Sequence, residues 1–92
     1  MTADTLRAQL KDDDPEIRRA ASLACAMKDD KNHIPDLIPM LDDSEPLVSR
    51  AAHAALKSLT SQDFGPAKDA SAKDRAKALE AWKTWWSKQQ GN

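Results

Sequence analysis

The residues that could carry out chemistry are few in this chain, and they are widely spaced. His33 and His53 lie 20 positions apart, and neither has a cysteine or second histidine at the spacing of a zinc site. The aspartates at 12–14 and 29–30 have ligand chemistry suited to calcium or magnesium, but no loop glycine and no distal glutamate accompany them. Helix caps and solvated turns explain both runs, so we expect neither a metal ion nor a cofactor.

Nucleophilic catalysis is not indicated either. Cys25 is the single cysteine, and its apolar neighbours favour a small buried side chain over a reactive thiol. No serine follows a glycine elbow, and no glycine-rich loop is present to cradle a phosphate. Because no nucleophile, base and orienting group come together, we predict that the protein is not an enzyme.

Arginines give a stronger signal, because one arginine position recurs. Arg50 follows Arg19 by 31 residues, which suits either paired anion contacts or arginines that bridge neighbouring repeats. We favour the bridging role for Arg19, with Asp12, Asp43 or main-chain carbonyls as partners. Arg18 has no counterpart one repeat later, so we expect it to be a free surface group on the solvent side of its helix. It is one of five candidate binding residues, with Arg50, His53, Lys83 and Trp85.

The elements that position these residues come in two copies. The offset of 31 residues superimposes a proline, an arginine and a pair of alanines on their later equivalents. The matching pairs are Leu6 and Leu37, Leu10 and Leu41, Asp12 and Asp43, Pro15 and Pro46, Ile17 and Val48, Arg19 and Arg50, Ala20 and Ala51, Ala21 and Ala52, and Ala24 and Ala55. A repeat of this length is typical of stacked helical hairpins.

Local signals predict where the helices begin and end. Pro15 and Pro46 fit the first position of a longer helix in each copy, where a missing N–H costs nothing. Pro39 should bend or shorten the helix before it, because it deletes an internal hydrogen bond. Ser71 and Asp74 form a capping-box pattern. We therefore expect helices over residues 3–11, 15–28, 33–41, 46–59 and 71–88.

Helical periodicity also predicts which side of the first long helix is buried. Its inward stripe is expected to hold Ile17, Ala20, Ala21, Ala24 and Met27, widened by Leu23 and Cys25, with Arg18, Ser22 and Lys28 in solvent. The small alanines allow neighbouring helix axes to approach closely.

These repeats resemble a known family. Residues 37–43 (LIPMLDD) and 46–52 (PLVSRAA), with their earlier copy, are similar to HEAT-like repeats of the short-period type named for the phycobilisome lyases. The resemblance implies an all-α fold, a short α-solenoid of two HEAT-like helical hairpins closed by a C-terminal capping helix. It also implies a scaffold that binds proteins. Its alternative is an accessory or regulatory piece of a lyase-like enzyme, with a small molecule held between the long helices near Arg50 and His53.

The 92 residues are expected to form one domain. Its parts are a first repeat (3–30), a second repeat (33–60), a connection (61–70) and the capping helix (71–88). A composition with two glycines, no tyrosine and many alanines favours helices over sheet.

The capping helix carries the three tryptophans of the chain. Trp82 and Trp86, one turn apart, are expected to close the end of the stack together with Leu79. Trp85 points elsewhere and is a candidate interface anchor, flanked by Lys83. A nucleic-acid patch on this helix is disfavoured, because Asp69, Asp74 and Glu80 interrupt its basic residues.

Net charge and hydropathy limit the classes of partner that we expect. A net charge of −1 provides no overall field for nucleic acid or for an acidic membrane. No apolar run reaches the length of a membrane span, and no signal peptide is evident, so the cytoplasm is the expected location. The expected partner is an unidentified protein. A homodimer is expected as well if Leu6 and Leu10 leave an apolar strip uncovered at the N-terminal face.

Overall fold

The computed structural model describes residues 3–67 and 69–90, and these parts are helical with no strand. The expected all-α solenoid is confirmed. The helices are α1 (Ala3–Gln9) and α2 (Pro15–Met27) in the first hairpin, η1 (Lys31–His33), α3 (Ile34–Leu37), η2 (Ile38–Asp42) and α4 (Pro46–Thr60) in the second, and α5 (Ala72–Gln89) at the end.

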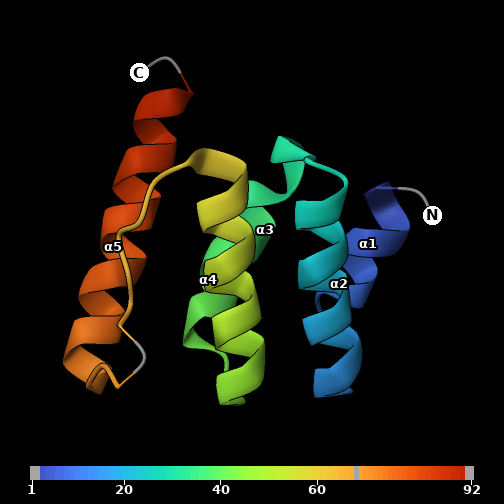
Figure 1. Ribbon diagram of the computed structural model, residues 1–92, viewed down its shortest axis with the longest axis horizontal. Coiled ribbons are helices and arrows are strands. Elements are labelled where there is room, and N and C mark those ends of the chain that lie inside the picture. Colours follow the sequence, from blue (N-terminus) through green and yellow to red (C-terminus); the bar gives the residue numbers. More distant parts are fainter. Residues whose placement is uncertain (1–2, 68, 91–92) are drawn as a thin grey trace.

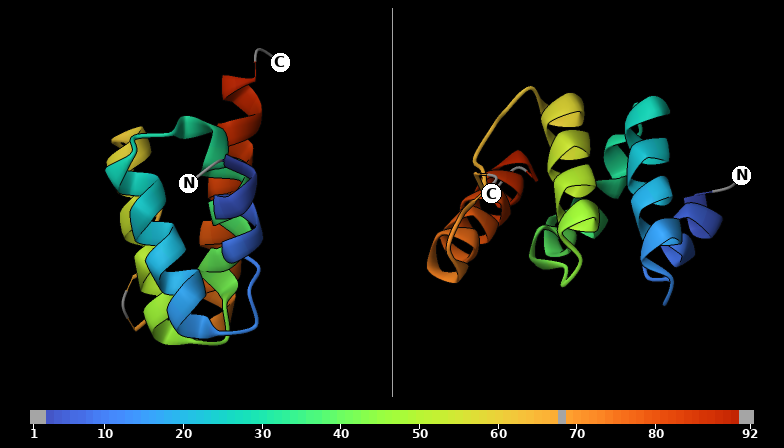
Figure 2. Two further views of the ribbon diagram at one scale, coloured as in Figure 1. Left: turned by 90° about the vertical axis from the view of Figure 1, so that its right-hand side faces the viewer. Right: turned by 60° about the horizontal axis from the view of Figure 1, so that its bottom comes forward.

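The helices form two layers. The long helices α2 and α4 lie side by side in one layer, and α1, the α3–η2 segment and α5 form the other (Figure 1). The side view in Figure 2 shows the same division. Since α5 packs against η2 and α3, it extends the layer of short helices. The position that a third long helix would occupy is taken by the connection between α4 and α5.

The local signals in the sequence are realised as hydrogen bonds. The Asp14 carboxylate accepts from the Glu16 amide ahead of α2, and the Ser71 hydroxyl accepts from the Asp74 amide ahead of α5. The short helix of the second repeat changes from α to 3-10 geometry at Ile38, just before Pro39, as expected when the ring removes a helical hydrogen bond. α4 ends at Thr60, and its C-cap residue Ser61 adopts a left-handed conformation with φ 60°.

One core runs through both repeats and reaches α5. It contains Leu6 and Leu10 from α1, Ile34 to Leu41 from the second short helix, the inner side of α4, and Trp82. Because Leu6 and Leu10 are only 1% and 2% exposed, the apolar strip considered at α1 is covered. The uncovered strip on which the predicted homodimer depended is therefore not present at these two leucines.

The expected orientation of α2 is wrong for several residues on both of its sides, although Ala21 and Cys25 are buried and Lys28 is exposed as expected. Ile17 and Ala20 are exposed and Met27 is 87% exposed, whereas Ser22 is fully buried. The Ser22 hydroxyl donates to the Arg18 carbonyl at 3.0 Å, which satisfies it inside the helix. Periodicity gave the spacing of the apolar residues correctly. The direction of α2 is set by its packing against α4, which selects the side with Ala21, Ser22 and Cys25.

Candidate functional site

Arg18 is the arginine that bridges the repeats. Its Nε donates to Asp43 Oδ2 at 2.9 Å and its Nη2 to Asp43 Oδ1 at 3.1 Å, while Nη1 donates to the carbonyls of Asp12 and Asp13. The Asp43 carboxylate raises the pKa of Arg18. The expectation that Arg18 is a free surface group is therefore wrong, because two N–H groups along one edge of its guanidinium bind both carboxylate oxygens of an aspartate of the next repeat.

Arg19 was expected to bridge the repeats, but it does not. It pairs with Glu16 of its own helix, at 3.1 Å between Nη2 and Oε2, and both side chains reach solvent. Its equivalent, Arg50, is exposed and makes no ion pair with any residue that the structure describes. The recurring arginine position thus points outward in both repeats, and the bridge comes from its non-recurring neighbour.

Arg50 and His53 line one hollow of about 680 Å³ beside α4. Its other described walls are Asp42, Asp43, Ser44, Pro46, Ser49, Ala54 and Lys57, Pro66 and Ala67 of the connection, and Arg75 of α5. α2 contributes none of them, so the hollow does not lie between the two long helices, where a small molecule was expected.

Within this hollow, His53 is paired with Asp63 of the connection that follows α4. Its Nε2 lies 2.8 Å from Asp63 Oδ1, which also accepts from the Gly65 amide, and Lys57 Nζ lies 3.7 Å from Asp63 Oδ2. The hydrogen bond from His53, followed by that from Gly65, lowers the pKa of Asp63. His53 therefore holds the connection in place. Among the described residues that line the hollow, Arg50 and Arg75 are the cations with no carboxylate partner in the described parts of the chain.

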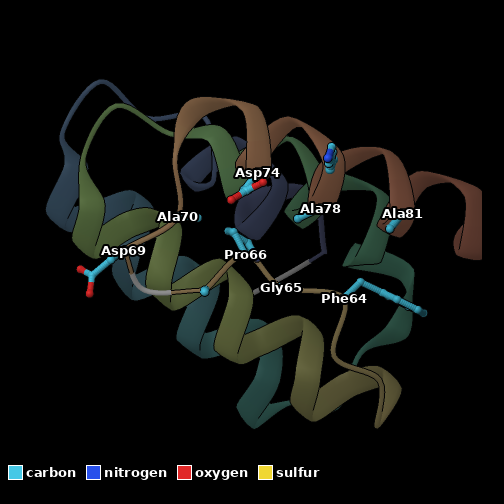
Figure 3. Close-up of a pocket in the computed structure, with 10 residues that line it drawn as sticks. Phe64, Gly65, Pro66, Asp69, Ala70, Asp74, Ala78 and Ala81 are labelled. Atoms are coloured by element: carbon cyan, nitrogen blue, oxygen red, sulfur yellow. The ribbon is translucent and has the colours of Figure 1, made fainter.

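A second hollow, of about 660 Å³, lies between the same connection and the first turns of α5. Figure 3 shows Pro66 and Gly65 facing Ala78 across it, with Asp69 and Asp74 at its rim. Apart from Asp69, Asp74 and Lys77, the side chains that line it are apolar or absent. It holds no arrangement of nucleophile and base.

The aromatic residues form one cluster with α5 at its centre. Trp82 is fully buried, its Nε1 donates to the Gly65 carbonyl at 2.7 Å, and its ring meets Phe64 edge-on at 4.9 Å between centroids. Trp86 and Leu79 are half-buried against the core. Trp85 is half-buried too, 6.3 Å from Phe64 and 6.4 Å from Trp82 between ring centroids.

The remaining predicted residue, Lys83, extends from α5 into solvent. It lies 3.6 Å from Glu80 of the same helix, and both side chains are largely exposed. Of the five predicted binding residues, the structure brings together Arg50 and His53, which line the same hollow. Lys83 and Trp85 are two residues apart on α5, so their side chains point to different sides of the helix. Arg18 is held in the interface between the repeats.

Sequence reasoning missed a buried histidine. His33 is fully buried, with Nδ1 3.4 Å from Asp36 and Nε2 3.5 Å from Asp30, and Arg7 of the first repeat donates to the same Asp36 at 2.8 Å. Burial raises the pKa of the nearby Cys25 thiol to about 11, and the two carboxylates add to the rise. The spacing of Asp30, His33 and Asp36 by three residues was the available signal. The group ties the two repeats together and leaves Cys25 unreactive.

The exposed large apolar side chains all lie on the layer of long helices. Among the described residues they are Ile17, Leu23 and Met27 on α2 and Leu47 on α4, with exposed fractions of 38%, 39%, 87% and 57%. Sequence reasoning placed three of them in the core stripe. Together they define what we call the long-helix face.

Stacked helical hairpins in two layers, with an arginine and aspartate joining the repeats, define a short α-solenoid. The sequence matches the family model described as HEAT repeats over residues 3–83, so the chain belongs to the HEAT-repeat family. Proteins of this family generally bind other proteins. No curated protein and no solved structure gave a match.

No helix in the described parts is long and apolar enough to cross a membrane. Within the same residues, no group of three or more His, Cys, Asp or Glu side chains is placed to hold a metal ion.

Proposed function

We propose that this protein is a non-catalytic scaffold module that binds a protein partner through the long-helix face. The supporting observation is that all four exposed large apolar side chains of the described residues lie on α2 and α4. Leaving such side chains in water is unfavourable, by roughly 25 cal/mol for each Å² of apolar surface. A layer of helices that exposes several such side chains is therefore a candidate interaction site.

The hollow beside α4 and the buried Cys25 thiol give little support to a catalytic function. The cationic hollow keeps His53 occupied by Asp63, and the thiol of Cys25 is buried and protonated. Neither group is therefore poised as a base or nucleophile. The cytoplasmic location and the lyase-related type of repeat remain predictions.

The test is affinity capture from a cell extract followed by mass spectrometry, with three matched forms of the protein. A variant with Met27→Ser and Leu47→Ser should fold normally, because both side chains are exposed, and should lose the captured partner. Trp85→Phe should retain it, because this change leaves the long-helix face intact. If Trp85→Phe loses the partner and the double variant keeps it, the interface lies on α5 instead.

A second candidate function is binding of a small anionic molecule, since Arg50 and Arg75 line the hollow beside α4 without a carboxylate partner among the described residues. This candidate predicts a ligand that copurifies with the protein, detected by mass spectrometry under native conditions. The substitution Arg50→Ser should remove that ligand and leave protein capture unchanged.

A further inference from the structure

Equivalent residues of the two repeats differ in exposure on one side only. On α4, Val48, Ala51 and Ala55 are 1%, 7% and 0% exposed. Their equivalents one repeat earlier are Ile17, which is 38% exposed, Ala20, which is exposed, and Ala24, which is half-buried. At 100° per residue these three positions form one continuous side of the helix. This side is covered in the second repeat and open in the first.

The difference has one structural cause. Each long helix packs on the short helix of its own repeat, α2 on α1 and α4 on α3 and η2. Only α4 also has a long helix on the side of the preceding repeat, and that helix is α2. The open side of α2 is therefore the continuation of the interface between the repeats, and no helix of the described residues covers it.

An aspartate at the edge of this side repeats the observed ion pair. Asp43 Oδ1 accepts from the Glu45 amide at 2.9 Å, which fixes the carboxylate in the position where it receives Arg18. Asp12, its equivalent, accepts from the Asp14 amide in the same way at 2.8 Å. Among the residues that the structure describes, Asp12 has no cationic partner. Its carboxylate is thus preset for an arginine.

We propose that Asp12 and the open side of α2 form a docking site for the last helical hairpin of another α-solenoid protein. That hairpin presents small residues, as α2 does to α4 with Ala21, Ser22 and Cys25. It also carries an arginine at the fourth position of its long helix, as α2 does with Arg18. The bound hairpin places this arginine on Asp12 and covers Ile17 and Ala20.

A second copy of the chain does not fit this site in the stacked orientation. Its last long helix, α4, has Ser49 where the arginine is needed. The side of α4 that would dock is occupied by the connection, which is anchored by the bond between His53 and Asp63. Head-to-tail stacking of identical chains would require the connection to be displaced and the bond between His53 and Asp63 to be broken.

The inference rests on the proposed function as a protein-binding module and narrows it to one site and one kind of partner. The experiments distinguish a failure of the proposed function from a failure of this inference. Without any protein capture by the long-helix face the proposed function fails, whereas capture that does not depend on Asp12 contradicts this inference alone.

The probe for the test is a synthetic solenoid of three tandem copies of residues 3–33. Its last hairpin ends on the same surface that covers the second repeat in the native protein. Mixed with the full-length chain in a sedimentation or calorimetry experiment, it should form a complex. Asp12→Asn on the chain should weaken that complex at least about tenfold, the factor that one charge-assisted hydrogen bond supplies.

Two controls locate the contact. Replacing the equivalent of Arg18 by Ala in the last copy of the probe should weaken binding as much as Asp12→Asn, and combining the two changes should weaken it no further. Lys83→Ser on α5 should leave binding unchanged. A folded, helical probe that fails to bind, or that binds equally well to Asp12→Asn, overturns the inference.

If the probe does not fold alone, the same hairpin is tested in one chain. One extra copy of residues 3–33 is inserted before residue 3, and unfolding in urea is followed by circular dichroism. A single transition at a higher midpoint than the native chain, lowered when Asp12 is changed to Asn, supports the inference. Separate unfolding of the added hairpin overturns it.

Sedimentation of the native chain alone tests whether a second copy of the chain binds the open side of α2. We expect a monomer at all accessible concentrations. Self-association that Ile17→Lys abolishes would assign the open side of α2 to a second copy, and the proposal of a different solenoid protein would be wrong.

Discussion

The two repeats contain nearly the same pattern of residues and experience different surroundings. Val48 is 1% exposed because a long helix lies in front of it, and Ile17 at the equivalent position is 38% exposed because none does. The comparison shows that periodicity determines which residues share one side of a helix. Whether that side is buried depends on the neighbour, which is the general property of solenoids in which each repeat contacts only adjacent ones.

The two ends of the stack differ in the same way. Beyond the second repeat, α5 and the connection cover α4 and η2, with Trp82 buried and bonded to Gly65. At the other end, α1 of the first repeat covers only part of α2. In the described residues, α4 is therefore covered on the side where the next repeat would lie, and α2 is open on the side where a preceding repeat would lie.

The largest effect is expected at the covered end. Trp82→Ala should lower the free energy of unfolding by about 3–5 kcal/mol, because it empties a fully buried ring site in a small core. Trp86→Ala should cost clearly less, since that ring is half-buried. Urea denaturation followed by circular dichroism measures both. Equal losses for the two variants would contradict the central place of Trp82.

A smaller effect is expected from a matched pair of truncations in the two repeats. Val48→Ala should cost about 2 kcal/mol, from two buried methyl groups and the space they leave. Ile17→Ala removes more carbon atoms but should cost about 1 kcal/mol or less, because its side chain is partly solvated already. The same urea series compares them. A larger loss at Ile17 would mean that α2 has a covering partner in solution.

The third comparison concerns the equivalent aspartates. Asp43→Asn should give a measurable loss of stability, smaller than that of Val48→Ala, because Arg18 loses its charged partner. Asp12→Asn should have almost no effect on the isolated chain, since the amide oxygen still accepts from Asp14 and no cation is lost. Thermal unfolding at low and high salt separates the two, because only the loss at Asp43 should shrink as salt increases.

The smallest effect is a pH dependence at the covered end. Hydrogen bonds from His53 and Gly65 hold the pKa of Asp63 below its ordinary value of 3.8. A lowered pKa in the folded state means that the contribution is present above about pH 4 and is lost as the pH falls through the folded pKa. Asp63→Asn should therefore reduce stability at neutral pH and flatten this part of the acid titration. An unchanged titration would exclude Asp63 as its source.

Much of the fold was available from the sequence because it depends on local chemistry. The offset between Pro15 and Pro46 indicated two hairpins, Asp14 and Ser71 were recognisable as caps, and Pro39 marked the change of helix type. Candidate sites were predicted less well. Two of the five binding residues, Arg50 and His53, line one hollow, and that hollow lies on the other side of α4 from α2.

The sequence by itself determined the repeat, the starts of the helices and the spacing of their apolar residues, because caps, prolines and periodicity act within a few residues along the chain. Only the tertiary structure decided that Arg18 and not Arg19 bridges the repeats, that His33 is buried between two aspartates, and that Ile17 is left open. Adjacent arginines on a helix point about 100° apart, so their roles depend on which side the next helix covers. That choice is made by packing between distant segments, where no local signal reaches.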